Sequence, residues 1–178
     1  ALGVALGSMV ANLTLGKKKY EGVQEDIKDI LKRAEVLREE LLELVEEDAR
    51  AFEPLSKAYG LPKNTEEERL RKEKIMEEAL KIASTAPVKI MEKSIEAIEL
   101  HERLVDIGNR IAISDVGVGV QLCKTSLIGA SLNVFINTKL MKDRGAAEEI
   151  NNKVKAMLKD GTEKADLVYN KVEEILWQ

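Results

Sequence analysis

Histidine, cysteine and aromatic residues are scarce in this 178-residue sequence, and each scarcity excludes a class of function. A single histidine, His101, excludes multi-histidine metal sites and catalytic arrangements that need two imidazoles. A single cysteine, Cys123, excludes an internal disulfide and fits a reducing compartment, so we expect a cytoplasmic protein. The aromatic content of 3% and the net charge of -4 argue against nucleic-acid binding. Any chemistry must rest on carboxylates, amides, hydroxyls, lysines and backbone groups.

Proline is also rare, with 3 in the chain, while 34% of the residues are charged and 44% are hydrophobic. This composition is typical of long helices with one solvated face and one buried face. The length fits one domain, which we place at residues 1–178. We therefore predict an all-α bundle of five to six long helices.

The sequence begins at Ala1 rather than Met, in an uncharged run over residues 1–16. A signal peptide would carry basic residues before its apolar stretch, and none is present. A membrane span needs about 20 mostly apolar residues, and Ser8, Asn12 and Thr14 interrupt this run. We expect a helix over 1–15 whose beginning lies outside this sequence, and no membrane association.

Apolar spacings of three and four residues predict further helices over about 21–58, 65–87, 88–105, 114–142 and 143–177. Pro87 cannot donate a hydrogen bond to the Ala83 carbonyl, so we expect a kink or a break near it. The helix over 114–142 is apolar nearly all round, which predicts a central position or a place at a subunit interface.

Two aspartates are the candidate catalytic residues. Asp48 falls on the apolar stripe of the helix over 21–58, where an unpaired carboxylate costs several kcal/mol and needs a partner or a function. Asp115 opens the nearly uncharged helix over 114–142, next to Ser114 and after Asn109. The structural alternative is that Asp48 belongs to an ion pair and that the other three residues cap helix ends.

Amides and lysines supply the remaining candidates for ligand binding. Asn133 and Asn137 lie on one face of the apolar helix, where they could recognise the polar edge of a heterocycle or bond to neighbouring helices. The run Lys17, Lys18, Lys19 and Tyr20 could attract an anionic ligand tail or be a solvated helix end. No metal is expected, because the residue three before His101 is Ile98 and the Glu-x-x-His pair of di-iron bundles fails.

Six ordered motifs carry a resemblance to a known family. They are LGSMVANLTLGKKKY (6–20), EDARAF (47–52), GLPKNTEEE (60–68), the Ala86-Pro87 break, GNRIAISD (108–115) and GASLNVFIN (129–137). Together they make the chain similar to the cyclodeaminase domain of formimidoyltransferase-cyclodeaminase and to its single-domain relatives, some of which are methenyltetrahydrofolate cyclohydrolases. Members usually begin with a Gly-rich PGGG-type stretch before the first helix, so the resemblance implies a domain truncated at its N-terminus.

The resemblance implies a tetrahydrofolate substrate, with or without a polyglutamate tail, and a homodimer or higher homo-oligomer. Cyclodeamination, a step of histidine degradation, converts 5-formimidoyltetrahydrofolate to 5,10-methenyltetrahydrofolate and ammonia. The substrate's own N10 is the nucleophile, so no cofactor beyond the folate is implied. Asp115 and Asp48 would share the acid–base and charge-stabilising roles. Asn109, Ser114, Asn133 and Asn137 would orient the pterin or the acids, and Lys17, Lys18 and Lys19 would attract the glutamate tail.

Two alternatives to the cyclodeaminase remain open at this point. A cyclohydrolase would act on the same methenyl carbon with water in place of ammonia, although the GLPKNT segment resembles the cyclodeaminases more closely. A non-catalytic helical interaction module would suit the regular stripe over 21–58. The acid at Asp48 and the Asn133/Asn137 pair are not expected in a purely structural bundle.

Overall fold

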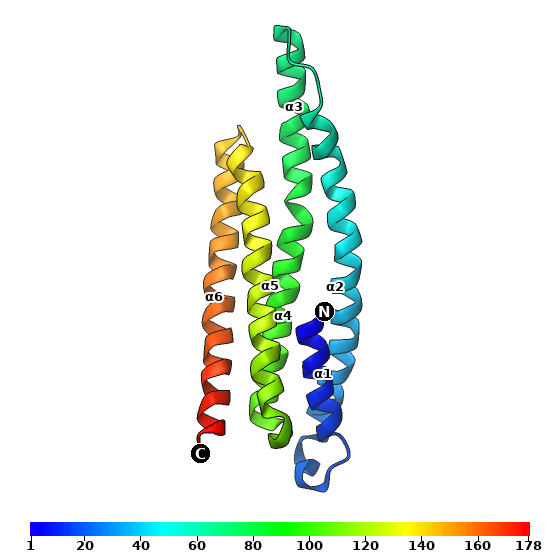
Figure 1. Cartoon of the computed structure of the whole chain (residues 1–178), viewed down its shortest axis with the longest axis vertical. Helices are drawn as coiled ribbons and strands as arrows, with labels where there is room; N and C mark the ends of the chain where they lie inside the picture. Colours follow the sequence, from blue (N-terminus) through cyan, green and yellow to red (C-terminus); the bar gives the residue numbers. More distant parts are fainter.

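The computed structural model describes all residues from 1 to 178, and it contains helices and turns but no strand. Figure 1 shows an elongated bundle whose long helices run along its long axis. The helices are α1 (Leu2–Thr14), α2 (Gln24–Tyr59), α3 (Glu66–Ala83), α4 (Thr85–Ile107), α5 (Ile113–Leu140) and α6 (Arg144–Leu176), with short 3-10 turns η1 (Lys18–Val23) and η2 (Arg110–Ala112). The predicted all-α bundle is confirmed.

Helix α5 occupies the middle of the bundle and packs against α1, α4 and α6. Its apolar residues interleave with those of its neighbours in one large core that includes Ile98, Leu104, Val120 and Leu127. By length and composition alone, the segment Arg110–Leu140 could cross a membrane. Packing against three helices accounts for part of this composition, since 44% of the most apolar window of the segment is buried. The prediction of a central apolar helix is confirmed, with its ends one or two residues earlier than expected.

Glycines let α1 approach the centre of the bundle closely. A Cβ atom at Gly119 of α5 would lie 2.2 Å from His101 Nε2 and 3.2 Å from the Gly3 carbonyl oxygen. A Cβ atom at Gly3 would lie 2.5 Å from Cys123 Sγ. The close contact among α1, α4 and α5 therefore requires glycine, which has no Cβ atom, at positions 3 and 119.

The kink expected at Pro87 is not confirmed. Helix α3 ends at Ala83, α4 begins at Thr85, and Ser84 joins them with helical dihedral angles. Pro87 is the third residue of α4, where a helical N–H lacks an intrahelical partner and proline is tolerated. The Ala83 carbonyl, which residue 87 would otherwise satisfy, accepts a hydrogen bond from Asn137 Nδ2 of α5 at 3.1 Å.

Local signals explain where other helices begin and end. Gly16 has a φ of +71°, which favours glycine and ends α1. Thr65 forms a capping box with Glu68 at the start of α3. On α2, Leu44 and Leu55 are buried, while Phe52, which we expect on the buried stripe, is half exposed.

Candidate functional site

One group of predicted residues gathers at the end of the bundle where α1 and α4 finish and α5 begins, the lower end in Figure 1. Tyr20 Oη accepts a hydrogen bond from the Arg110 backbone N–H at 3.0 Å. Asn109 Nδ2 donates to the Leu13 carbonyl at 2.8 Å, and the Asn109 N–H donates to Thr14 Oγ1 at 2.9 Å. These bonds tie the turn after α1 to the turn that leads into α5.

The side chains of this lower group differ in what they leave free. Asn109 Oδ1 accepts from the Ile111 N–H at 3.1 Å, so both polar ends of Asn109 are engaged within the chain. Ser114 is exposed and Asp115 is half-buried in the first turn of α5. Asp115 takes part in none of the chain's ion pairs and is the sole acid of α5. It is therefore a carboxylate that a ligand can use.

The lysine run lies at the same end, outside the bundle. Lys17, Lys18 and Lys19 are all exposed. The Lys19 ammonium lies 5.7 Å from the centre of the Tyr20 ring, and the other two lysines form no ion pair. The run forms an exposed cationic surface next to the turns that hold Tyr20 and Asn109.

A second group of predicted residues lies in the other half of the bundle. Asp48 on α2 is half-buried, and burial, the sole cause identified, raises the pKa of its carboxyl group. Asn133 on α5 is exposed, whereas Asn137 is buried and donates to the Ala83 carbonyl. The structure thus leaves Asp48 unpartnered and engages Asn137 in the packing of α5 against the α3–α4 junction.

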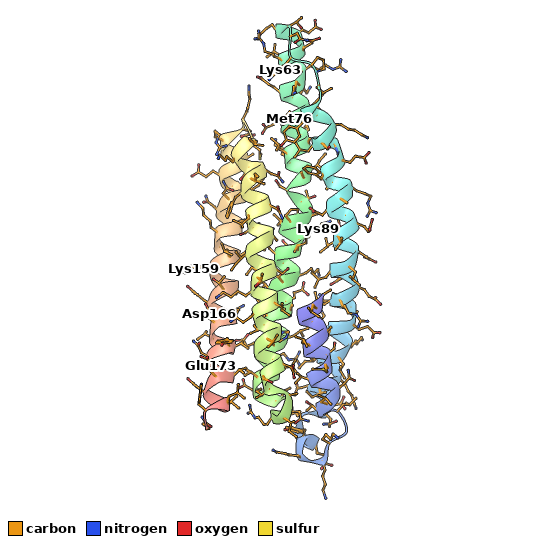
Figure 2. The ribbon with its side chains drawn as sticks, in the orientation of Figure 1. Lys63, Met76, Lys89, Lys159, Asp166 and Glu173 are labelled. Carbon is orange, nitrogen blue, oxygen red and sulfur yellow. The ribbon has the colours of Figure 1, made fainter.

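The two aspartates are not brought together within one chain. Glu47, next to Asp48, pairs with Lys89 in the upper half of α4, which Figure 2 labels. Asp115 lies at the opposite end of α4, where this helix ends at Ile107. About 18 residues of α4 separate these two levels, which corresponds to about 27 Å at 1.5 Å per residue. One reacting atom therefore cannot lie next to both carboxylates of the same chain.

A groove of about 560 Å³ runs between α5 and α6 at the lower end. Of the predicted site residues, Ser114 alone lines it. Sequence reasoning missed the others, which include Gln121 on α5, Tyr169 and Glu173 on α6, and Trp177 directly after α6. One signal in the sequence could have indicated the groove. The single Trp, Trp177, lies about two helical turns after Tyr169, in a sequence with only three Tyr and two Phe.

The remaining reactive side chains are enclosed in the core. His101 is fully buried, its Nδ1 lies 2.8 Å from the Ala97 carbonyl, and burial lowers its pKa. Cys123 is buried as well, and burial raises the pKa of its thiol to about 12. No group of three or more His, Cys, Asp or Glu side chains is placed to hold a metal ion.

Comparison with known proteins places these features in a family. Residues 1–156 match the family model described as formiminotransferase-cyclodeaminase. The chain is 40% identical over 173 residues to a methenyltetrahydrofolate cyclohydrolase of Methylorubrum extorquens, covering 97% of this chain and 83% of that protein. It is 32% identical to the mouse formimidoyltransferase-cyclodeaminase, covering 97% of this chain and 32% of the mouse protein.

The fold has a solved counterpart. The crystal structure of a formiminotetrahydrofolate cyclodeaminase from Thermotoga maritima superposes with a TM-score of 0.79 at 29% identity, covering 98% of this chain and 81% of that chain. Family model, relatives and fold agree, and they agree with the six motifs of the sequence. The chain belongs to the formiminotransferase-cyclodeaminase family.

Proposed function

We propose that this chain is a methenyltetrahydrofolate cyclohydrolase, which opens the one-carbon bridge between N5 and N10 of 5,10-methenyltetrahydrofolate. The observation that carries this proposal is the 40% identity to a protein of that name over 83% of its length. In the reaction, a water oxygen bonds to the bridging carbon and one water proton leaves, which gives a neutral hydroxyl adduct. The bond from that carbon to N5 then breaks while N5 gains a proton and the hydroxyl group loses its own, so that 10-formyltetrahydrofolate forms with the net release of one proton.

Asp115 is the proposed general base for the attacking water. Asp115 is half-buried, belongs to no ion pair and directly follows Ser114, which lines the groove. The bridging carbon is already electrophilic because the methenyl group carries a positive charge. A fixed anion next to it both accepts the water proton and favours binding of the cation. Lys17, Lys18 and Lys19 lie at the same end and would attract the anionic glutamate tail.

The first test is turnover, followed by the loss of methenyl absorbance after subtraction of spontaneous hydrolysis. Asp115→Asn should lower kcat by about 10²–10⁴-fold, the usual contribution of a general base. Asp106→Asn is the matched control, because Asp106 is an exposed acid at the same end that pairs with Lys171. Equal loss in both variants, or wild-type turnover in Asp115→Asn, would refute the role of Asp115.

Asp48 can serve the same site if two chains pair through α5. The exposed side of α5 beyond the groove carries an apolar stripe of four residues that are 38–62% exposed, namely Ile128, Leu132, Ile136 and Leu140. A two-fold dimer is the commonest assembly, and with its axis perpendicular to α5 it would set two such stripes antiparallel. The first turn of one α5, with Asp115, would then lie toward the half of the partner that holds Asp48 and Asn133.

Mixing inactive variants tests this arrangement. If a site combines Asp115 of one chain with Asp48 of the other, a heterodimer of Asp115→Asn and Asp48→Asn holds one intact site of two. Random pairing of equal amounts then restores about a quarter of wild-type turnover. Leu132→Asp should prevent both dimerisation and this recovery. Mixtures that stay inactive while dimers form would show that the two aspartates do not share a site.

Cyclodeamination is the second candidate function. It is favoured by the similarity to the Thermotoga maritima cyclodeaminase, a chain of which 81% is covered. N10 would attack the formimidoyl carbon, and its proton would pass through the same carboxylate to the imino nitrogen. The bond between that carbon and the resulting amino group would then break as the group takes one further proton from solvent and leaves as ammonia. Parallel assays with 5-formimidoyl- and 5,10-methenyltetrahydrofolate decide between the two reactions. Turnover of neither substrate would leave the interaction module as the remaining function.

A further inference from the structure

The groove between α5 and α6 has the dimensions and the wall chemistry of a binding site for a flat ring. Its volume of about 560 Å³ falls in the range of about 300–1,000 Å³ that is typical of small-molecule sites. The α5 wall offers Val118 and Leu122 together with the polar Ser114 and Gln121. We propose that this groove binds the pterin ring of the folate substrate, an inference that rests on the proposed function and names the subsite.

Aromatic side chains support a planar ligand. Trp177 is 87% exposed, although large apolar side chains are usually enclosed, and it is the single Trp of the chain. It lines the groove together with Tyr169 and Leu176. An exposed indole beside an aliphatic wall is suited to stack on a heteroaromatic ring, which would cover the apolar surface of both partners.

Glu173 supplies the polar recognition. Its carboxylate lines the groove near the lower end of α6, where Figure 2 labels it. Tyr169 Oη donates a hydrogen bond to Glu173 Oε1 at 3.2 Å, and this bond raises the pKa of Tyr169. The bond orients the carboxylate, and each of its two oxygens keeps a lone pair that can accept a further hydrogen bond. A pterin presents an amino group next to a ring N–H, and two adjacent donors can bond to the two oxygens of one carboxylate.

The position of the groove connects this subsite to the proposed chemistry. Ser114 lines the groove and Asp115 is the next residue in the same helical turn. A ring held by Glu173 and Trp177 would therefore lie at the same end of the bundle as the turn that carries the proposed base. Residues 169–177, which form the other wall of the groove, lie beyond residues 1–156, the part of the chain that the family model matches.

Binding of 5-formyltetrahydrofolate, a stable analogue, tests the subsite by calorimetry on the whole chain. Glu173→Gln and Trp177→Ala should each raise Kd at least tenfold, and Trp177→Phe should recover most of the affinity because it keeps a ring. Glu163→Gln and Leu167→Ala are matched controls on exposed positions of α6 away from the groove, and their Kd should stay within twofold of wild type. Circular dichroism confirms that each variant is folded.

The outcomes separate this inference from the proposed function. Wild-type turnover with unchanged Kd and KM in both groove variants overturns the pterin subsite and leaves the cyclohydrolase standing. Analogue binding that depends on Glu173 and Trp177, without turnover of either folate substrate, supports the subsite and overturns the reaction. A wild-type chain that does not bind the analogue overturns both.

Discussion

The hydrogen bond between Asn137 and the Ala83 carbonyl compensates for the missing N–H of Pro87, and this can be measured. Asn137 and Ala83 are each at most 9% exposed, and the distance from Asn137 Nδ2 to the Ala83 carbonyl oxygen is 3.1 Å. Asn137→Ala leaves the carbonyl buried without a donor, which costs about 1–3 kcal/mol. For a chain of this size, a loss of about 2 kcal/mol lowers Tm by about 4–8 °C.

Pro87→Ala should make the asparagine less important. An alanine at position 87 has an N–H that can donate to the Ala83 carbonyl four residues earlier. The next residue already does the equivalent, because the Val88 N–H donates to the Ser84 carbonyl at 3.3 Å. We expect Asn137→Ala to cost about 1 kcal/mol less in the Pro87→Ala background, a coupling that a double-mutant cycle resolves.

Urea unfolding, monitored by circular dichroism at 222 nm, gives the free energies of unfolding of the four proteins in the cycle. These are the wild type, Asn137→Ala, Pro87→Ala and the double variant. Asn133→Ala is the matched control, because this asparagine is exposed on the same helix and its loss should change stability by less than about 0.5 kcal/mol. Equal losses from Asn137→Ala in the two backgrounds would refute the compensation. So would an Asn137→Ala variant as stable as wild type.

Three further predictions concern packing and titration. Burial raises the pKa of the Asp48 carboxyl group, so its ionisation disfavours the folded state. The free energy of unfolding should therefore fall as the pH rises from the pKa of Asp48 in the unfolded chain to its higher pKa in the folded chain. Asp48→Asn should flatten this fall, which urea titrations at several pH values measure. Cys123, with a thiol pKa of about 12, should react with a disulfide reagent at pH 8 only as fast as the chain opens, so labelling much faster than unfolding would contradict its burial. Gly119→Ala should cost at least about 1–3 kcal/mol because its Cβ would overlap His101 Nε2, whereas a Cβ at Gly145 meets only ordinary contacts and Gly145→Ala should be neutral or stabilising in thermal unfolding.

Local patterns predicted the helices because each boundary depends on residues close to it. Gly16 ends α1 through a positive φ, and Thr65 starts α3 through a capping box. The Pro87 kink was the exception, since the outcome depends on where α4 begins. Proline is tolerated in the first turn of a helix. The Ala83 carbonyl, which Pro87 cannot satisfy, accepts a hydrogen bond from Asn137, 50 residues after the proline.

The candidate site was predicted in part, for a reason of geometry. Ser114 and Asp115 were identified because they open a helix that carries almost no other charge, and periodicity identifies only the residues that share a face of one helix. Periodicity does not say how far along the bundle axis residues of different helices lie from one another. Asp48 and Asp115 were therefore grouped, although about 27 Å along α4 separates their positions on that axis. The groove was missed because its two walls lie about 50 residues apart, on helices that each read as ordinary bundle helices.

Helix α5 links the core, the proposed subunit contact and the proposed chemistry through its lack of charge. Its two lysines are removed from the first turn: Lys124 pairs with Asp166, and Lys139 lies in the last turn. Asp115 is the sole acid of α5 and forms no ion pair. In the proposed reaction, a fixed carboxylate of this kind accepts a proton from water and favours the cationic one-carbon bridge. The scarcity of histidine is no obstacle to that proposed reaction, because the substrate would supply the electrophile and water the nucleophile.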